Sequence, residues 1–130
     1  MENTVLIVED DVPTSALWTK HLKHWGWNVA AVASAEEAIP AITRHQPRAV
    51  ILDVMLGDVM SGWDLLSRLR ASRSTHDLPV FVVSALDEPK RAYREGATAF
   101  LVKPCSPHLL VSKIVAGLVL MDSWPTRWEM

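Results

Sequence analysis

Polar side chains with complementary chemistry follow four short apolar runs of this 130-residue chain. Glu9, Asp10 and Asp11 follow the first run, Asp53 the third, Ser84 the fourth and Lys103 the fifth. Carboxylates that meet in a partly dry cleft repel one another, and a bound hard cation such as Mg²⁺ is the natural compensation. A lysine ammonium and a serine hydroxyl at the same place could bind one anionic oxygen. These residue types therefore indicate a site where a divalent cation and an amine hold an anionic group.

Five apolar runs predict the strands that would bring these side chains together. The runs are Thr4 to Val8, Asn28 to Val32, Ala49 to Leu52, Pro79 to Val83 and Ala99 to Val102. Nearly continuous apolar sequence is typical of strands that are buried on both faces. Helical patterns separate the runs, so the sequence predicts an α/β fold in which a doubly wound parallel sheet lies between two layers of helices. The carboxyl ends of parallel strands share one edge, where ligands bind in such folds.

The first two helices are predicted from the spacing of apolar residues and from their ends. Trp18, Leu22 and Trp25 recur at the spacing of one helical stripe, and Gly26 follows where helices commonly end. The second helix contains Pro40. Because proline removes a backbone donor, we expect this helix to be bent or shortened.

The remaining three helices follow the same logic. In the third, Leu65, Leu66 and Leu69 lie on one side, with Arg68 and Arg70 on the other. The fourth, after Pro89, is expected to be brief. The fifth begins near Ser106-Pro107, and its apolar stripe comprises Leu110, Ile114 and Leu118.

Composition limits the chain to one domain. With 49% hydrophobic and 22% charged residues, 130 residues can bury one substantial core and leave no room for a second ordinary domain. We expect the domain to span residues 1–122, and residues 123–130, which include Trp124 and Trp128, to form a short tail. Packing of this tail against the domain is favoured, and contact with a partner is the alternative. The net charge of −2 argues against direct nucleic-acid binding through bulk electrostatics.

The sequence also bears on location. The amino terminus lacks the features of a secretory signal, and no apolar run approaches the roughly 20 residues needed to cross a bilayer. The single cysteine, Cys105, cannot form an internal disulfide, which suits a reducing compartment. We therefore expect a soluble, cytoplasmic protein without membrane contact, in which Cys105 is a small buried side chain.

Four motifs, each near the end of its own predicted strand, carry a family resemblance. They are Val5-Leu6-Ile7-Val8-Glu9-Asp10-Asp11, Leu52-Asp53-Val54-Met55-Leu56 with Ser61-Gly62 beyond it, Ser84-Ala85, and Gly96-Ala97-Thr98-Ala99-Phe100-Leu101-Val102-Lys103-Pro104. In this order, and over roughly Thr4 to Leu120, the chain resembles the receiver domain of bacterial two-component response regulators. The resemblance implies the flavodoxin-like, CheY-like (βα)5 fold.

The resemblance also implies a reaction. Asp53 would accept a phosphoryl group from a phosphohistidine of a sensor histidine kinase or a histidine phosphotransfer protein. Mg²⁺ would be bound by the carboxylates of Asp10 and Asp53 and by the backbone carbonyl of Met55, with Glu9 acting through bound water. Phosphoryl transfer asks the protein for positioning and charge neutralisation, which a cation and one lysine provide.

A switch is implied by the same family pattern. The phosphoryl group on Asp53 would draw the Ser84 hydroxyl inward, and the ring of Phe100 would rotate into the space behind it. The surface formed by the fourth helix, fifth strand and fifth helix would then change shape, and a downstream protein target would bind the changed surface. The change would be a shift between two pre-existing arrangements of the domain. The bond between Lys103 and Pro104 is expected to be cis.

The chain departs from the family pattern at several positions. Gly57 stands where the family usually has proline, and Gly62 comes one residue later than usual, so we expect a looser loop after Asp53. Met55 and Leu86 flank the place where a hydrolytic water would enter, and both are apolar. We therefore expect slow self-dephosphorylation.

Other functions stay open at this point. The domain could be a receiver excised from a hybrid histidine kinase, although the Met1 start weighs mildly against this. A Mg²⁺-dependent aspartate-nucleophile phosphatase is disfavoured because Met55 stands where a second acid is needed. A dinucleotide-binding domain lacks its glycine motif, and a degenerate docking module would not need the acidic set. We expect a stand-alone phosphoacceptor that is not an enzyme, is a monomer or weak homodimer, and acts through protein contact or onward transfer.

Overall fold

The computed structural model describes residues 3–57 and 59–122. Strands and helices alternate along the chain: β1 (Thr4–Val8), α1 (Val12–His24), β2 (Asn28–Val32), α2 (Ala35–His45), β3 (Ala49–Asp53), α3 (Gly62–Ala71), β4 (Val80–Ser84), α4 (Pro89–Arg94), β5 (Ala99–Val102) and α5 (Pro107–Asp122). Trp124 and Trp128, and with them the expected packing of the tail, lie outside the described residues.

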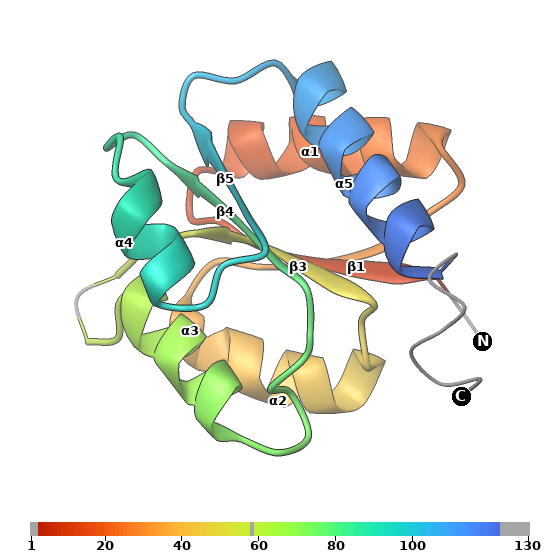
Figure 1. Cartoon of the computed structure of the whole chain (residues 1–130). Coiled ribbons are helices and arrows are strands. Elements are labelled where there is room, and N and C mark those ends of the chain that lie inside the picture. The colour runs from red at the N-terminus through yellow and green to blue at the C-terminus, as the bar shows by residue number, and fades with distance from the viewer. Residues whose placement is uncertain (1–2, 58, 123–130) are drawn as a thin grey trace.

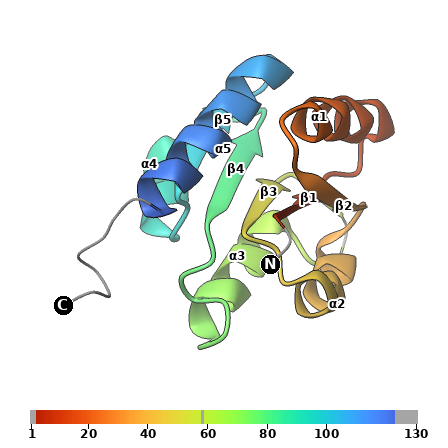
Figure 2. The same cartoon turned by 90° about the vertical axis from the view of Figure 1, so that its right-hand side faces the viewer.

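The strands form one parallel sheet in the order β2-β1-β3-β4-β5. Helices α1 and α5 cover one face, and α2, α3 and α4 cover the other (Figures 1 and 2). The predicted doubly wound α/β fold is therefore confirmed. Because β1 lies between β2 and β3, its carboxyl end adjoins that of β3, and this is the place where the strand order reverses.

Two apolar cores, one on each face, hold the helices to the sheet. Leu6 and Val8 of β1 point into the core beneath α2, α3 and α4, whereas Val5 and Ile7 point into the core beneath α1 and α5. All four side chains are completely buried. The uninterrupted apolar sequence of the central strands thus reflects burial on both faces.

The edge strands do not follow this rule. Asn28 and Ala31 of β2 are exposed, and the other three residues of the strand are half-buried. The expectation that all five strands are buried on both faces is wrong for β2 and for β5, because each has only one neighbouring strand. Edge position cannot be read from the apolar content of a run.

Two strand ends and one helix face also differ from the predictions. Asp53 and Ser84 are the last residues of β3 and β4 rather than the first residues beyond them, so both side chains are buried. Trp25 caps the end of α1 and is half exposed, so it does not extend the buried stripe of Trp18 and Leu22. Gly26 follows with a positive φ of 91°, the conformation that helix ends favour in glycine.

Helix α2 continues through Pro40 to His45, so Pro40 does not shorten it, and the expected alternative, a bend at Pro40, stays a prediction. The Ser34 side chain caps the helix by accepting a hydrogen bond from the Glu37 amide. The loss of one backbone donor at Pro40 is outweighed by tertiary packing, because the side chains of Ala38 and Ile42 are buried in the core.

Helix α4 has six residues, which bears out the expectation that it is short. The Arg91 guanidinium lies 4.4 Å from the centroid of the Trp63 ring, so a cation–π contact joins α4 to α3.

Among residues 3–57 and 59–122, no helix combines the length and apolarity needed to traverse a bilayer.

Arg70, which the sequence places on the side of α3 opposite its leucines, joins two connecting segments. Its guanidinium donates to the carbonyls of Leu78 at 2.7 Å and Gly96 at 2.9 Å, and to those of Thr75 and His76 at 3.3 Å. Burial lowers the pKa of Arg70, and the nearby Asp77 opposes that shift. The side chain thus links the end of α3 to the segments that enter β4 and β5.

Arg70→Met is expected to lower the free energy of unfolding by about 2 kcal/mol or more, because carbonyls that now accept from a charged donor would lose their partner. Chemical denaturation measures the loss. The matched control is Arg73→Met, because Arg73 is exposed and a surface substitution changes stability by roughly 0.5 kcal/mol or less. Equal effects of the two substitutions would contradict this account of Arg70.

Candidate functional site

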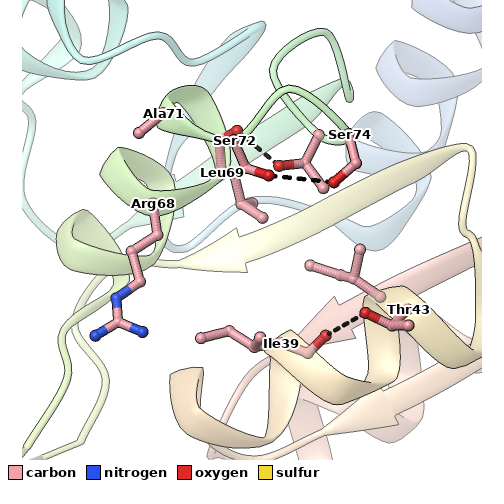
Figure 3. A pocket seen from close by; sticks show the side chains of 9 residues that line it. Ile39, Thr43, Arg68, Leu69, Ala71, Ser72 and Ser74 are labelled. Carbon is pink, nitrogen blue, oxygen red and sulfur yellow. Dashed lines mark hydrogen bonds between the residues drawn. The ribbon is translucent and has the colours of Figure 1, made fainter.

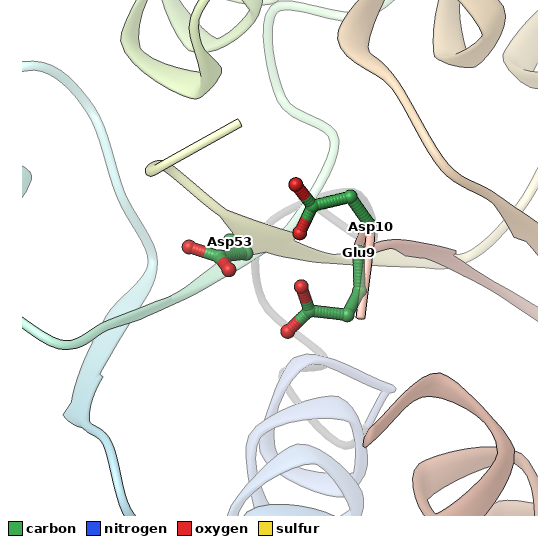
Figure 4. Close-up of side chains that lie close together, drawn as sticks. All are labelled: Glu9, Asp10 and Asp53. Carbon is green, nitrogen blue, oxygen red and sulfur yellow. The ribbon is translucent and has the colours of Figure 1, made fainter. Parts of the chain in front are cut away.

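The carboxylates of Glu9, Asp10 and Asp53 meet at the carboxyl edge of the sheet. One oxygen from each lies within 4.8 Å of the others. Figure 4 shows Glu9 and Asp10 extending from the end of β1 towards Asp53 at the end of β3. The register explains the meeting, because Val8 pairs with Leu52 and the next residues of the two strands are Glu9 and Asp53. Glu9 and Asp53 are buried, and Asp10 is exposed.

Lys103 approaches this cluster from the end of β5. Its Nζ lies 2.5 Å from Glu9 Oε1 and 2.8 Å from Asp53 Oδ2. Burial alone would lower the pKa of Lys103, but its hydrogen bonds and charge interactions with Asp53 and Glu9 outweigh that effect and raise the pKa. Lys103 therefore carries a positive charge between two carboxylates. The peptide bond from Lys103 to Pro104 is cis.

Burial is the largest influence on the Glu9 carboxyl, and it raises the pKa of Glu9 to about 7. The hydrogen bond from Lys103 opposes the shift, whereas the nearby Asp53 adds to it. The Asp11 amide also donates to Glu9 Oε2, at 3.2 Å. Three carboxylates facing one ammonium leave an excess of negative potential, so the donor set suits a hard divalent cation.

Both oxygens of Asp53 have partners. Oδ2 accepts from Lys103, and Oδ1 accepts from the Met55 amide at 2.9 Å. The backbone after β3 therefore turns back onto its own last residue, which fixes the carboxylate direction. The Met55 side chain is 53% exposed beside it. The metal contact expected from the Met55 carbonyl stays a prediction.

Ser84 is fully buried at the end of β4. Its Oγ accepts from the Leu86 amide at 3.1 Å, and its carbonyl accepts from the Lys103 amide at 2.7 Å. Phe100, in β5, is half-buried and packs against the core beneath α2, α3 and α4. The switching roles of Ser84 and Phe100 stay predictions.

Asp11 was expected from the sequence to join the acidic residues at this edge, but it lies outside the group of three carboxylates, and a second neighbour, Trp18, was not identified from the sequence. Asp11 is exposed and caps α1, because its carboxylate accepts from the amide and hydroxyl of Thr14. The Trp18 ring, from the same helix, has Lys103 Nζ 5.7 Å from its centroid. The sequence marks Trp18 only as one residue of an apolar stripe, and no local signal connects it with a residue 85 positions away.

An apolar pocket of about 420 Å³ lies apart from the carboxylates, between α2 and α3 (Figure 3). Ile39, Ile42 and Leu69 line it together with several hydroxyl groups. Its lining contains no carboxylate, so it does not contribute to the acidic cluster. Cys105 is half-buried against the core beneath α1 and α5 rather than buried as expected, and burial raises the pKa of its thiol.

Comparison with known proteins agrees with the fold and the geometry of the acidic site. The family described as the response regulator receiver domain matches residues 5–115. The relative named "Probable transcriptional regulatory protein TcrX", from Mycobacterium tuberculosis, is 33% identical over 128 residues. That match covers 92% of this chain and 53% of TcrX, so the chain spans about half the length of this relative.

Solved structures of receiver domains share the fold. A CheY-like response regulator receiver domain protein from Methanospirillum hungatei has a TM-score of 0.84 at 25% identity, and the match covers 94% of this chain and 98% of that one. The receiver domain of a signal transduction histidine kinase from Syntrophus aciditrophicus has a TM-score of 0.83 at 25% identity, with 95% and 96% covered.

Gly62 is expected to be indispensable for the loop that leaves Asp53. A Cβ at this position would lie 2.3 Å from Val54 Cα and 2.8 Å from the Asp53 carbonyl oxygen. Both are backbone atoms, so making room for the Cβ would require the main chain to move. Gly62→Ala should therefore lower the free energy of unfolding by at least about 2 kcal/mol, which thermal or urea unfolding measures. Ser67→Ala, on the exposed side of the same helix, is the control and should be nearly neutral. A neutral Gly62→Ala would show that the loop does not need this close approach.

Proposed function

The chain belongs to the response regulator receiver domain family of two-component signal transduction, and from this membership we propose that Asp53 is its phosphoacceptor. The donor is a phosphohistidine of a sensor histidine kinase or a histidine phosphotransfer protein. One observation supports this role above all others: Asp53 lies where two further carboxylates and the Lys103 ammonium converge. A carboxylate in that position can attack phosphorus while the amine and a cation neutralise the phosphoryl oxygens.

The reaction balances without a general base. An oxygen of the Asp53 carboxylate forms a bond to phosphorus, and the bond from phosphorus to the histidine nitrogen of the donor breaks. The leaving imidazole keeps the electron pair of that bond. The carboxylate is itself the nucleophile, so the chain has only to position it and to stabilise charge.

Mg²⁺ is the cofactor that we propose for this site. The carboxylates of Asp10 and Asp53 and the Met55 carbonyl would hold it, with Glu9 acting through water. Hard carboxylate oxygens within 4.8 Å of one another fit this cation. When bound, the cation supplies charge neutralisation at the phosphoryl group. Lys103 then exchanges its present contact with Asp53 for the phosphoryl oxygens.

Ser84, Phe100 and Lys103 are the proposed switch residues. The Ser84 hydroxyl would donate to a phosphoryl oxygen, and the ring of Phe100 would move further into the protein behind it. The output would be a changed surface on α4, β5 and α5, offered to a downstream protein target. The domain exists in two arrangements, with and without this changed surface. The phosphoryl group shifts the equilibrium between them only by the difference between its interaction free energies with the two.

Several broader properties belong to the proposal. The receiver domain spans residues 1–122, and residues 123–130 are a tail. The chain acts as a signalling domain rather than as an enzyme, is a monomer or weak homodimer, binds no nucleic acid directly and works in the cytoplasm. Family membership is the support for these properties.

A receiver that works as one part of a hybrid histidine kinase is the second candidate. Its support is the likeness to the kinase receiver domain from Syntrophus aciditrophicus, which this chain matches over 95% of its length. The phosphoacceptor chemistry would be the same in both cases. A phosphatase is less well supported, because the side chain two residues after Asp53 is that of Met55 and offers no acid.

Phosphorylation at Asp53 can be tested with a small donor. Wild-type protein incubated with Mg²⁺ and acetyl phosphate is expected to gain the mass of one phosphoryl group in intact mass spectrometry. Asp53→Asn should gain none, because an amide is not a nucleophile towards phosphorus. Addition of EDTA should also prevent the gain.

Asp64→Asn provides the matched control, because Asp64 is an exposed carboxylate that caps α3 rather than joining the cluster. It should be phosphorylated as fast as the wild type. A phosphoryl adduct on Asp53→Asn would assign the acceptor elsewhere. Continuous release of phosphate from added phosphomonoesters would favour the phosphatase.

The apolar Met55 side chain should make the phosphoryl group long-lived. It is 53% exposed beside Asp53 and offers no polar atom to orient an attacking water. Met55→Asn is therefore expected to shorten the lifetime of the phosphorylated protein several-fold, as measured by its decay after removal of donor. Val59→Asn, in the same loop and 88% exposed, should leave the lifetime unchanged. If the phosphoryl group on the wild-type protein lasted only seconds with no phosphatase present, the proposed protective effect of Met55 would be contradicted.

A further inference from the structure

Lys103 has a third neighbour besides its two carboxylates, and this neighbour is uncharged. The face of the Trp18 indole lies 5.7 Å from Lys103 Nζ, within the distance of about 6 Å at which an ammonium is attracted to an aromatic ring. We propose that Trp18 is a positioning residue that holds the Lys103 ammonium at the phosphoacceptor while its anionic partners change. The proposal rests on the proposed function and adds a residue to its site.

Trp18 is placed to do this by the core rather than by the site. It lies in α1, is 2% exposed and packs in the apolar cluster beneath α1 and α5, together with Val83 and Leu101. Val83 and Leu101 belong to β4 and β5, the strands that also position Ser84 and Lys103. The ring is therefore fixed in position before any ligand arrives, which is the condition for orienting a flexible side chain.

The Lys103 side chain needs such a restraint. Lys103 lines an open pocket of about 400 Å³, and Trp18, Leu17, Ala85 and Cys105 are among the other lining residues. Space on that side would allow the four-carbon stem to adopt other rotamers. Trp18 also lines this pocket, and its ring attracts the ammonium.

An uncharged partner has an advantage during phosphoryl transfer. At present the ammonium bonds to Glu9 and Asp53, and esterification of Asp53 would replace the charge of its carboxylate with that of the phosphoryl oxygens. Lys103 would then have to move to those oxygens, while Glu9 competes with them for the ammonium. The π face attracts the ammonium equally before and after transfer and, being a face rather than a lone pair, leaves the three N–H donors available.

The test compares Trp18→Phe with Trp18→Leu. Both remove volume from the same place in the core, but only the first keeps an aromatic face. The measured quantity is the affinity for beryllofluoride, a phosphoryl mimic, in the presence of Mg²⁺. We expect Trp18→Leu to weaken binding about three- to ten-fold, and Trp18→Phe to lose no more than about two-fold.

Leu22→Ala is the control for core damage. Leu22 lies one turn further along the buried stripe of α1 and belongs to the same apolar cluster, but no contact joins it to Lys103 among the described residues. This variant should be less stable and yet bind beryllofluoride with wild-type affinity. An equal loss in Trp18→Phe and Trp18→Leu, or an equal loss in Leu22→Ala, would overturn the positioning role.

A spectroscopic measurement tests the contact without any ligand. The emission of Trp18 is obtained as the difference between wild type and Trp18→Phe, and again in a Lys103→Met background. Removal of the ammonium should alter this difference spectrum, and an unaltered spectrum would overturn the proposal even if Trp18→Leu fails to fold. Failure of the wild type to bind beryllofluoride would instead overturn the proposed function, so the two failures are distinguishable.

Discussion

Repulsion among carboxylates at the end of β1 and β3 is the constraint on which the site depends. Two of them, Glu9 and Asp53, are buried, and the ion pairs that Lys103 forms with both reduce the repulsion between them. Lys103 is 50 residues from Asp53 and 94 from Glu9, so the pairing forms only in the completed fold. A buried ion pair adds little net stability. The cluster must therefore be held in place by the rest of the structure.

The sheet and its two cores provide that support. Completely buried residues of β1 and β3 on both faces fix the two strand ends, and with them the separation of the carboxylates. The connecting segments are held separately. Gly62 allows α3 to approach the backbone after Asp53, and Arg70 ties the segments that enter β4 and β5. The repulsion among the carboxylates at this edge of the sheet is thus offset by packing and hydrogen bonds elsewhere in the domain.

The sequence predicts the fold and the meeting of Glu9, Asp10, Asp53 and Lys103 because both follow from local rules. Apolar runs mark strands, and the end of a parallel strand marks the ligand edge. Edge position, the packing of Pro40 within α2, and the partners of Trp18 and Arg70 depend on what lies beside each residue in space. Those features have no period or motif. The sequence therefore did not indicate the bonds that Arg70 makes, and its interpretation of β2 as a strand buried on both faces was wrong.

The present bonds of Ser84 and Lys103 also suggest how the proposed switch could respond without breaking the site. Ser84 Oγ accepts from the Leu86 amide, and an oxygen that accepts in this way still has its own proton to donate. The hydroxyl would donate a hydrogen bond to a phosphoryl oxygen on Asp53 while the bond from the Leu86 amide remains. Any movement of the hydroxyl would then be transmitted to the segment that leads into α4. The Ser84 carbonyl also accepts from the Lys103 amide, so the same movement would reach β5. Phosphorylation of one carboxylate would thereby bias two parts of the output surface, because a single buried serine is hydrogen-bonded to the segment that leads into α4 and to the residue that follows β5.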